Sequence, residues 1–278
     1  MILTGTTGLA GVIGWPVAHS LSPRLHNFWL EALGIDGAYI PLAVKPENLS
    51  LALWALPALG FKGANITVPH KEQALALVEK SDSFAKQIGA VNTIRVDEKG
   101  RLIGSNTDAY GFIKNLKSEA RHWRPSRPVL VLGAGGAARA VCVALLSVGV
   151  REIRICNRTH SRAEGMAEEI GGPLVALHWG DREDAAEGVG LLVNTTKLGM
   201  TGAPKLRMPL TKLPPSAIVN DIVYTPLMTP LLASAGERGN RIIDGLGMLL
   251  HQAQPSFTAW YGKKPKVTQA LRNHVLGG

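Results

Sequence analysis

The sequence predicts an α/β protein built from two α/β domains, and three observations support this prediction. Short apolar runs alternate with segments of helical period along nearly the whole chain, which is typical of a mostly parallel sheet. A glycine-rich turn joins the apolar run at 129–132 to an alanine-rich segment, as in a strand that leads directly into a helix. A polar stretch with prolines at 121–128 separates the two series and indicates a domain boundary.

The first domain is expected to alternate strands and helices before it ends in a hairpin. Strands are predicted at 11–14, 38–42 and 64–68. The following helices begin at Ser22, with Ser22 as N-cap and Pro23 as first helical residue, near Leu49, and at Pro69. Strands at 92–96 and 101–104 flank a charged turn that ends in glycine, which predicts a β-hairpin, and a helix over 108–120 follows.

The second domain, 121–245, is predicted to be Rossmann-like. Its strands are expected at 129–132, 152–156, 190–194, 217–222 and 240–243, and its helices at 136–148, 161–170 and 228–238. Two amphipathic helices at 246–260 and 267–276 have no strand between them, so we expect them to return to the first domain. The first domain would then comprise 1–120 and 246–278, with a cleft between the two domains.

Composition excludes several classes of protein. The net charge of +9 favours anionic partners, but no basic run is interleaved with aromatic residues, so we expect no nucleic-acid binding. No apolar run approaches the ~18 residues of a membrane helix, and the N-terminus lacks a secretory signal pattern, which predicts a cytoplasmic protein. The two cysteines, Cys142 and Cys156, are interpreted as core residues in a reducing compartment, and no metal site is predicted.

The glycine-rich turn predicts a dinucleotide site. Its residues form a G-x-G-x-x-A variant whose amides, with the helix N-terminus, suit a pyrophosphate: Gly133, Ala134, Gly135, Gly136 and Ala137. About 24 residues later, where NAD-binding chains carry an acidic ribose ligand, this chain has Asn157, Arg158 and Thr159, followed by Arg162. Guanidinium groups suit a 2′-phosphate, so NADP(H) is the expected cofactor. The alternative is that both arginines are solvated surface cations.

Polar residues also follow two later strands, at the edge of a parallel sheet where ligands bind. The segments are 193–200 and 221–226. Further cofactor contacts are predicted at Thr195, Thr196, Met200, Ile222, Gly245 and Met248.

The first domain carries polar residues where a small anionic ligand would fit. Ser20 and Ser22 place two hydroxyls at a helix start, a favourable geometry for an anion. Asn65 and Thr67 are expected to share one strand face. Lys71 falls in the first helical turn, where a cation opposes the helix dipole, so another benefit is expected to maintain it. Asp108 follows the hairpin at another helix start.

Together these segments resemble the shikimate dehydrogenase family. The resemblance spans nearly the whole chain in the family's order, at 20–23, 65–71, 89–93, 106–108, 133–138, 157–159, 194–196, 199–200, 224–226 and 247–253. One departure lies at Thr196 and Lys197, where the family often has a proline-containing turn.

The resemblance implies NADPH-dependent, reversible reduction of 3-dehydroshikimate to shikimate in aromatic amino-acid biosynthesis. It implies that Ser20 and Ser22 bind the substrate carboxylate, with Tyr224 nearby. The residues that would hold the substrate hydroxyls are Asn65, Thr67, Asn92 and Gln252. Lys71 and Asp108 would be the catalytic pair, and the proton could be carried by Lys71 alone or by the two groups as one coupled unit.

Two other functions remain open at this point. One is a quinate/shikimate dehydrogenase of the same family, and the other is a catalytically inactive NADP(H)-binding regulator. The expected state is a monomer or a homodimer.

Overall fold

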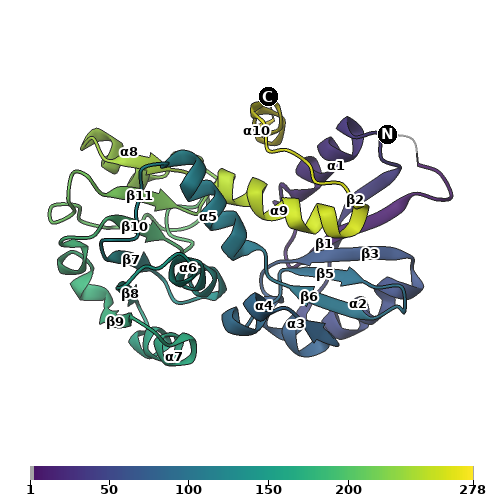
Figure 1. Cartoon of the computed structure of the whole chain (residues 1–278), viewed down its shortest axis with the longest axis horizontal. Helices are drawn as coiled ribbons and strands as arrows, with labels where there is room; N and C mark the ends of the chain where they lie inside the picture. Colours follow the sequence, from purple (N-terminus) through teal and green to yellow (C-terminus); the bar gives the residue numbers. More distant parts are fainter. Residues whose placement is uncertain (1–2, 278) are drawn as a thin grey trace. The chain divides into compact units, whose positions relative to one another are not determined.

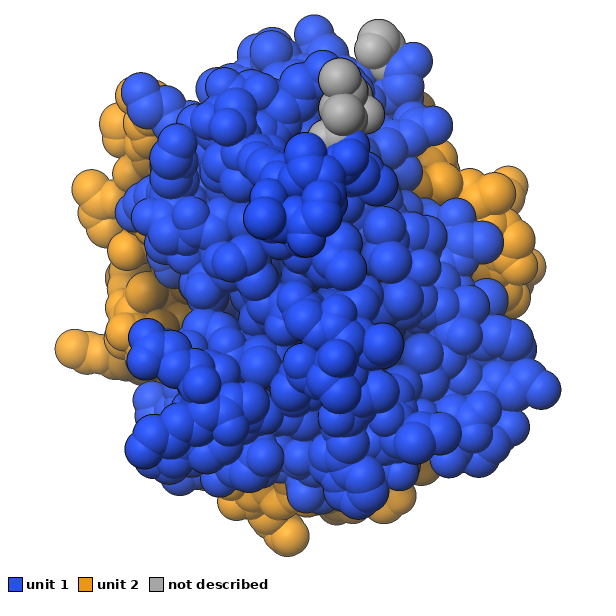
Figure 2. Space-filling view, turned by 90° about the vertical axis from the view of Figure 1, so that its right-hand side faces the viewer, with its two compact units in different colours: residues 1–111, 249–278 blue, residues 112–248 orange. Residues whose placement is uncertain are grey.

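The computed structural model describes residues 3–277, which fold into two compact units. Unit 1 contains residues 1–111 and 249–278, and unit 2 contains residues 112–248, as coloured in Figure 2. The boundaries fall inside α5 (Asp108–Glu119) and α9 (Leu246–Tyr261) rather than at 120 and 245. The second half of α5 packs against the start of α9, since a Cβ on Gly247 would overlap the Asn115 side chain, and Asn115 also donates to the Asp244 carbonyl just before α9 at 3.2 Å.

Unit 1 is built on a six-stranded sheet with the strand order β2-β1-β3-β5-β6-β4. The strands are β1 (Gly8–Gly14), β2 (Gly37–Ala43), β3 (Phe61–Ile66), β4 (Lys80–Ser81), β5 (Thr93–Val96) and β6 (Leu102–Ser105). Three of the five pairings are parallel, and the β5–β6 hairpin contributes both antiparallel ones, so the prediction of a mostly parallel sheet is confirmed.

Helices cover both faces of this sheet (Figure 1). One apolar core contains Leu49, Leu53 and Leu56 of α2 (Leu49–Ala58), together with Ala74 of α3 (Lys71–Leu77) and Ala85 of α4 (Ser83–Ile88). The helices α1 (Ser22–Ala32) and α9 lie on the opposite face, where their aromatic side chains meet Tyr39. The last helix, α10 (Gln269–Leu276), packs on α1.

Unit 2 has a six-stranded, fully parallel sheet with the strand order β12-β11-β10-β7-β8-β9. Its elements are β7 (Val129–Leu132), α6 (Gly136–Ser147), β8 (Ile153–Asn157), α7 (His160–Ile170), β9 (Leu174–His178), β10 (Leu191–Asn194), β11 (Ile218–Asp221), α8 (Pro230–Glu237) and β12 (Arg241–Ile243). The central strands β7 and β10 are buried throughout, which explains their uninterrupted apolar runs. The Rossmann-like prediction is confirmed.

Several local predictions were wrong. Ser22 is the first helical residue of α1 and Leu21 is the N-cap, so Ser22 does not cap the helix. Pro69 lies in the turn before α3, which begins at Lys71, and Thr67 lies just beyond β3. The elements β4, α4 and β9 were not predicted, because β4 and α4 are very short and the edge strand β9 has no fully buried residue.

Among residues 3–277, none of the helices combines the length and apolarity needed to cross a bilayer. Both cysteines in this range are free and buried, and burial raises the pKa of Cys142 to about 12 and that of Cys156 to about 11.

Candidate active site

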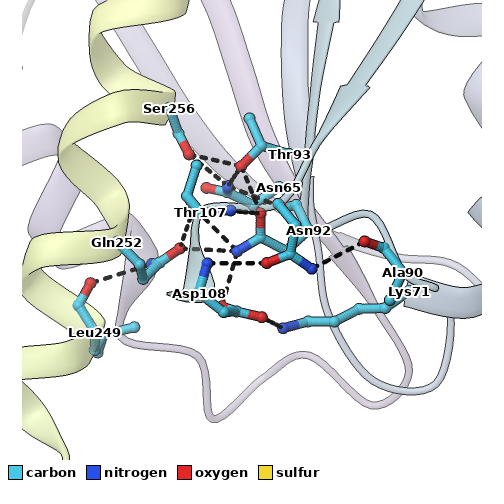
Figure 3. A network of polar contacts seen from close by, with 11 residues as sticks. Asn65, Lys71, Ala90, Asn92, Thr93, Thr107, Asp108, Leu249, Gln252 and Ser256 are labelled. Carbon is cyan, nitrogen blue, oxygen red and sulfur yellow. Dashed lines mark hydrogen bonds and ion pairs between the residues drawn. The ribbon is translucent and has the colours of Figure 1, made fainter. Parts of the chain in front are cut away.

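A lysine and an aspartate meet at the starts of two helices in unit 1 (Figure 3). Lys71 is the first residue of α3 and Asp108 the first residue of α5, and Lys71 Nζ lies 2.5 Å from Asp108 Oδ2. The two side chains are 22% and 10% exposed. The ammonium is therefore held at a fixed point and still reaches solvent. A proton donor needs both properties, because it must be reprotonated after each transfer.

Asn92 holds the other oxygen of this carboxylate. Its amide nitrogen donates to Asp108 Oδ1 at 2.8 Å, and its own Oδ1 accepts from the Thr107 backbone amide at 2.9 Å. Gln252 of α9 joins the network, since its Oε1 lies 3.4 Å from Asn92 Nδ2 and 3.3 Å from Thr107 Oγ1. Asn92 is 2% exposed and Gln252 is 9% exposed, so Asp108 is fixed by groups that have little freedom to move.

Asn65, at the end of β3, is bonded entirely within the protein. Its amide nitrogen donates to the Asn92 carbonyl at 3.1 Å, and its Oδ1 accepts from the Tyr39 hydroxyl at 2.7 Å. The same nitrogen approaches Thr93 Oγ1 at 3.0 Å and Ser256 Oγ at 3.1 Å. Asn65 therefore links β3, β5, β2 and α9 around the residue that holds Asp108.

The paired serines lie at the start of α1. The Ser22 backbone amide donates to Ser20 Oγ at 3.3 Å, and the buried Ser22 hydroxyl bonds to Tyr39. Burial raises the pKa of Tyr39 well above its usual value, so this hydroxyl stays neutral. Through Tyr39 and Asn65, the serine pair is connected to the strand that carries Asn92.

A buried histidine supports Tyr39 from the helix side. The His26 ring stacks on the Tyr39 ring with centroids 4.1 Å apart and planes within 5°. Both His26 ring nitrogens are buried without a hydrogen-bond partner among the described residues. Burial lowers the pKa of His26 to about 3, so the ring is neutral and acts as an aromatic packing surface.

The glycine-rich turn of unit 2 leaves open space at the N-terminus of α6. Gly133 has φ +110°, and a Cβ there would lie 2.7 Å from Thr195 Oγ1, so only glycine allows this approach. Gly135 is the N-cap of α6 and no side chain caps the helix. A Cβ on Gly135 or Gly136 would meet nothing within 4 Å. Ala134 and Ala137, half-buried, complete a turn that fits a phosphate group.

The end of β8 carries two exposed arginines. Arg158 follows Asn157, whose amide donates to the Thr159 carbonyl at 2.8 Å, and Arg162 lies in the first turn of α7. Within residues 3–277, neither guanidinium forms an ion pair. The segment 157–159 holds no carboxylate, and this combination fits a 2′-phosphate.

Two adjacent strand ends carry the remaining predicted cofactor residues. Thr195 and Thr196 follow β10, and the Thr195 hydroxyl donates to the Leu132 carbonyl at 2.6 Å. Ile222 follows β11, and a Cβ on Gly245 would overlap its carbonyl, so the two backbones touch. The side chains at this edge of unit 2 that are partly exposed are Thr195, Thr196, Met200, Ile222, Tyr224 and Met248. Burial raises the pKa of Tyr224.

The structure thus brings Lys71, Asp108, Asn92, Asn65 and Gln252 into one bonded network, with the serine pair connected to it. Thr67 stands just after β3, and its hydrogen bonds within residues 3–277 are made by its backbone alone: its amide donates to the Ile13 carbonyl and its carbonyl accepts from the His70 amide, each at 2.9 Å. Sequence reasoning gave no site role to five members of the network: Tyr39, Thr93, Asn106, Thr107 and Ser256. Thr93, Asn106 and Thr107 lie in segments that carry the family resemblance, whereas the only signal at Tyr39 and Ser256 was a hydroxyl group.

Comparisons with known proteins show the family to which the chain belongs. Residues 12–94 match the family model described as the shikimate dehydrogenase substrate binding domain, and residues 117–197 match shikimate / quinate 5-dehydrogenase. The chain is 57% identical to the shikimate dehydrogenase (NADP(+)) of Paramagnetospirillum magneticum, covering 99% of this chain and 100% of the relative. It is 54% identical to that of Rhodospirillum rubrum, with 99% of each covered.

Solved structures are similar over the same length. A Thermus thermophilus shikimate 5-dehydrogenase in complex with NADP(H) and shikimate has a TM-score of 0.87 at 38% identity, covering 97% of this chain and 99% of that one. A Corynebacterium glutamicum quinate dehydrogenase in complex with NAD has a TM-score of 0.91 at 31% identity, covering 98% and 99%. Both family models, the curated relatives and the solved folds agree, and the chain therefore belongs to the shikimate dehydrogenase family.

Proposed function

We propose that this chain is an NADP-dependent shikimate dehydrogenase that reversibly reduces 3-dehydroshikimate to shikimate in aromatic amino-acid biosynthesis. The observation that carries the proposal is the Lys71–Asp108 pair, 2.5 Å apart and held by Asn92. Carbonyl reduction needs a proton donor beside the developing alkoxide, and a fixed, partly solvated ammonium is such a donor.

Different residues of the chain would bind the carboxylate and the hydroxyl groups of the substrate. Ser20 and Ser22, with Tyr224, bind the carboxylate, because hydroxyl groups at a helix start suit an anion. Thr67, Asn92 and Gln252 hold the ring hydroxyls. Asn65 belongs to this group, but its amide reaches the substrate only by exchanging a bond with Tyr39, Thr93 or Ser256.

Lys71 transfers the proton. In reduction its ammonium donates to the carbonyl oxygen, while Asp108 keeps Nζ in position and Asn92 keeps Asp108 in position. The proton is replaced from solvent, which the 22% exposure of the lysine side chain allows. In alcohol oxidation the same groups take the proton back.

The proposed cofactor is NADP(H), which supplies or accepts the hydride when bound. Gly133, Gly135 and Gly136, with Ala134 and Ala137, would hold its pyrophosphate, since the space beside Gly135 and Gly136 is open and a Cβ on either residue would enter it. Asn157, Arg158, Thr159 and Arg162 would hold the 2′-phosphate, and Thr195, Thr196, Met200, Ile222, Gly245 and Met248 the nicotinamide half.

One assay tests the proposal. Purified protein is mixed with shikimate and NADP⁺, and NADPH formation is followed by absorbance. Turnover is expected, with kcat/KM for shikimate above that for quinate and for NADP⁺ above that for NAD⁺. Equal or higher kcat/KM for quinate would favour the quinate/shikimate dehydrogenase alternative. NADP(H) binding with no turnover would favour the inactive regulator and refute the proposal.

The proposal also includes a cytoplasmic location and a monomeric or homodimeric state. It assigns unit 1 to the substrate and unit 2 to the cofactor. Size-exclusion chromatography with light scattering would determine the oligomeric state.

A further inference from the structure

A fully buried carboxylate lies at the strand edge of unit 2. Asp221 is the last residue of β11 and is 0% exposed. Its neighbour across the sheet is Asn194, the last residue of β10, also 0% exposed. Asn194 Nδ2 donates to Asp221 Oδ1 at 2.9 Å. Neither residue belongs to the catalytic network or to the proposed cofactor contacts.

Asp221 forms hydrogen bonds to the loop 222–229 that follows its own strand. Its Oδ1 also accepts from the Val223 backbone amide at 3.1 Å, and its Oδ2 accepts from the Thr229 hydroxyl at 2.7 Å. Thr229 is the N-cap of α8, where its oxygen accepts from the Leu232 amide at 3.3 Å. Both ends of the segment 222–229 are therefore attached to one carboxylate.

Through Asn194, the same carboxylate fixes the loop after β10. Asn194 Oδ1 accepts from the backbone amide of Thr196 at 3.0 Å and from its hydroxyl at 2.8 Å. Asn194 Nδ2 also lies 3.2 Å from the Leu198 carbonyl. The bond to Asp221 decides which way this amide points, because only the nitrogen end can donate to a carboxylate.

We propose that Asp221 is a positioning residue for the cofactor: its ionised carboxylate holds the loops 195–198 and 222–229 in the arrangement that receives the nicotinamide half of NADP. The inference rests on the proposed function, because those loops carry Thr195, Thr196 and Ile222. Asp221 is not a catalytic residue, since it acts through Asn194, Val223 and Thr229.

The burial of this charge supports a role in function rather than in stability. Burial raises the pKa of Asp221 to about 6, although the bonds from Thr229, Val223 and Asn194 lower it. The carboxylate is ionised at neutral pH, yet it forms no ion pair with a charged side chain among residues 3–277, so no ion pair offsets the cost of burying it. Ionisable groups on the surrounding elements are Lys197, Tyr224, Glu237 and Arg241.

The test compares Asp221→Asn with wild-type protein by calorimetric titration of NADP⁺ and of shikimate. The asparagine keeps the shape but replaces the charged acceptor facing Thr229 with an amide. At pH 8 the Kd for NADP⁺ is expected to rise about tenfold, the usual effect of one charge-assisted hydrogen bond. The Kd for shikimate should stay unchanged. Asp184→Asn, an exposed acid in the same unit, is the matched control and should bind NADP⁺ like wild type.

Acidification provides a readout that a purely structural role would not give. As the pH falls through about 6, wild-type Asp221 becomes protonated and resembles the variant. The ratio of the two Kd values should therefore fall from about tenfold at pH 8 to below about twofold at pH 5. The titration of the cofactor's own 2′-phosphate cancels in this ratio, because both proteins bind the same ligand.

Two further variants keep the test decisive if Asp221→Asn folds poorly. Thr229→Val removes the bond to Oδ2 and should weaken NADP⁺ binding, whereas Thr229→Ser keeps the hydroxyl and should restore it. A variant Kd within twofold of wild type at pH 8, or a ratio that does not change with pH, would overturn the inference alone. Wild-type protein that binds no NADP⁺ would overturn the proposed function and this inference together.

Discussion

Replacing Lys71 with methionine removes the proposed proton donor and keeps most of the side-chain stem. In the structure this ammonium contacts Asp108 Oδ2 at 2.5 Å, and the other polar side chains bonded to Asp108 or Asn92 are amides and hydroxyls. Those groups do not donate protons efficiently near neutral pH. The loss should therefore match the full contribution of a general acid, a fall in kcat of about 10²–10⁴-fold. This fall corresponds to about 3–5 kcal/mol in the activation free energy.

The KM for shikimate should change much less, because the ring would still meet the serine pair, Asn92 and Gln252. Folding should be affected only moderately, since the ion pair is partly exposed and Asp108 keeps its bond to Asn92. Steady-state rates of NADPH formation and a thermal melt of each variant measure these quantities. Asp184→Asn, far from the network in sequence and exposed, is the control.

A second comparison asks whether the two groups act as a unit. If they do, Lys71→Met combined with Asp108→Asn should lower kcat little more than Lys71→Met alone. A kcat for Lys71→Met within about threefold of wild type would refute the assignment of Lys71 as proton donor, whatever the double variant does.

Three other predictions concern the cofactor site and acid stability. Arg158→Gln combined with Arg162→Gln should lower kcat/KM for NADP⁺ by about 10–100-fold and leave NAD⁺ nearly unaffected; an equal fall for both cofactors would contradict the 2′-phosphate assignment. Gly135→Ala should weaken NADP⁺ binding without lowering Tm, because its Cβ enters open space. Gly133→Ala should also lower Tm, because its Cβ would meet Thr195. Wild-type NADP⁺ affinity in Gly135→Ala would exclude a phosphate beside this residue. Since the pKa of His26 falls from 6.5 to about 3 on folding, stability present above pH 6.5 should be lost as the pH drops toward 3. Between pH 7 and pH 4 this loss is about 3 kcal/mol, and His26→Phe should remove it in urea unfolding; an unchanged pH dependence would show that His26 is not responsible.

The sequence by itself determined the features that depend on neighbouring residues. The alternation of apolar runs and helical periods predicted two α/β domains, because both periodicities are local. The glycine-rich turn was equally readable, since Gly133 through Ala137 form the whole turn and the helix start in one short segment. The absence of a carboxylate at 157–159 could be read in the same way. The pairing of Lys71 with Asp108 came from the family resemblance, not from any local pattern.

Only the tertiary structure decided which polar side chains meet. Gln252 lies 160 residues from Asn92, and Ser256 lies 191 residues from Asn65, yet each pair is within hydrogen-bond distance. No periodicity encodes such contacts, because they depend on how α9 packs against the sheet. The same holds for Asp221: the sequence placed it at the end of a strand, but only the pairing of β10 with β11 brings Asn194 beside its carboxylate. Hydrophobic pattern is a local property, whereas hydrogen-bond partnership in a core is set by packing across the whole fold.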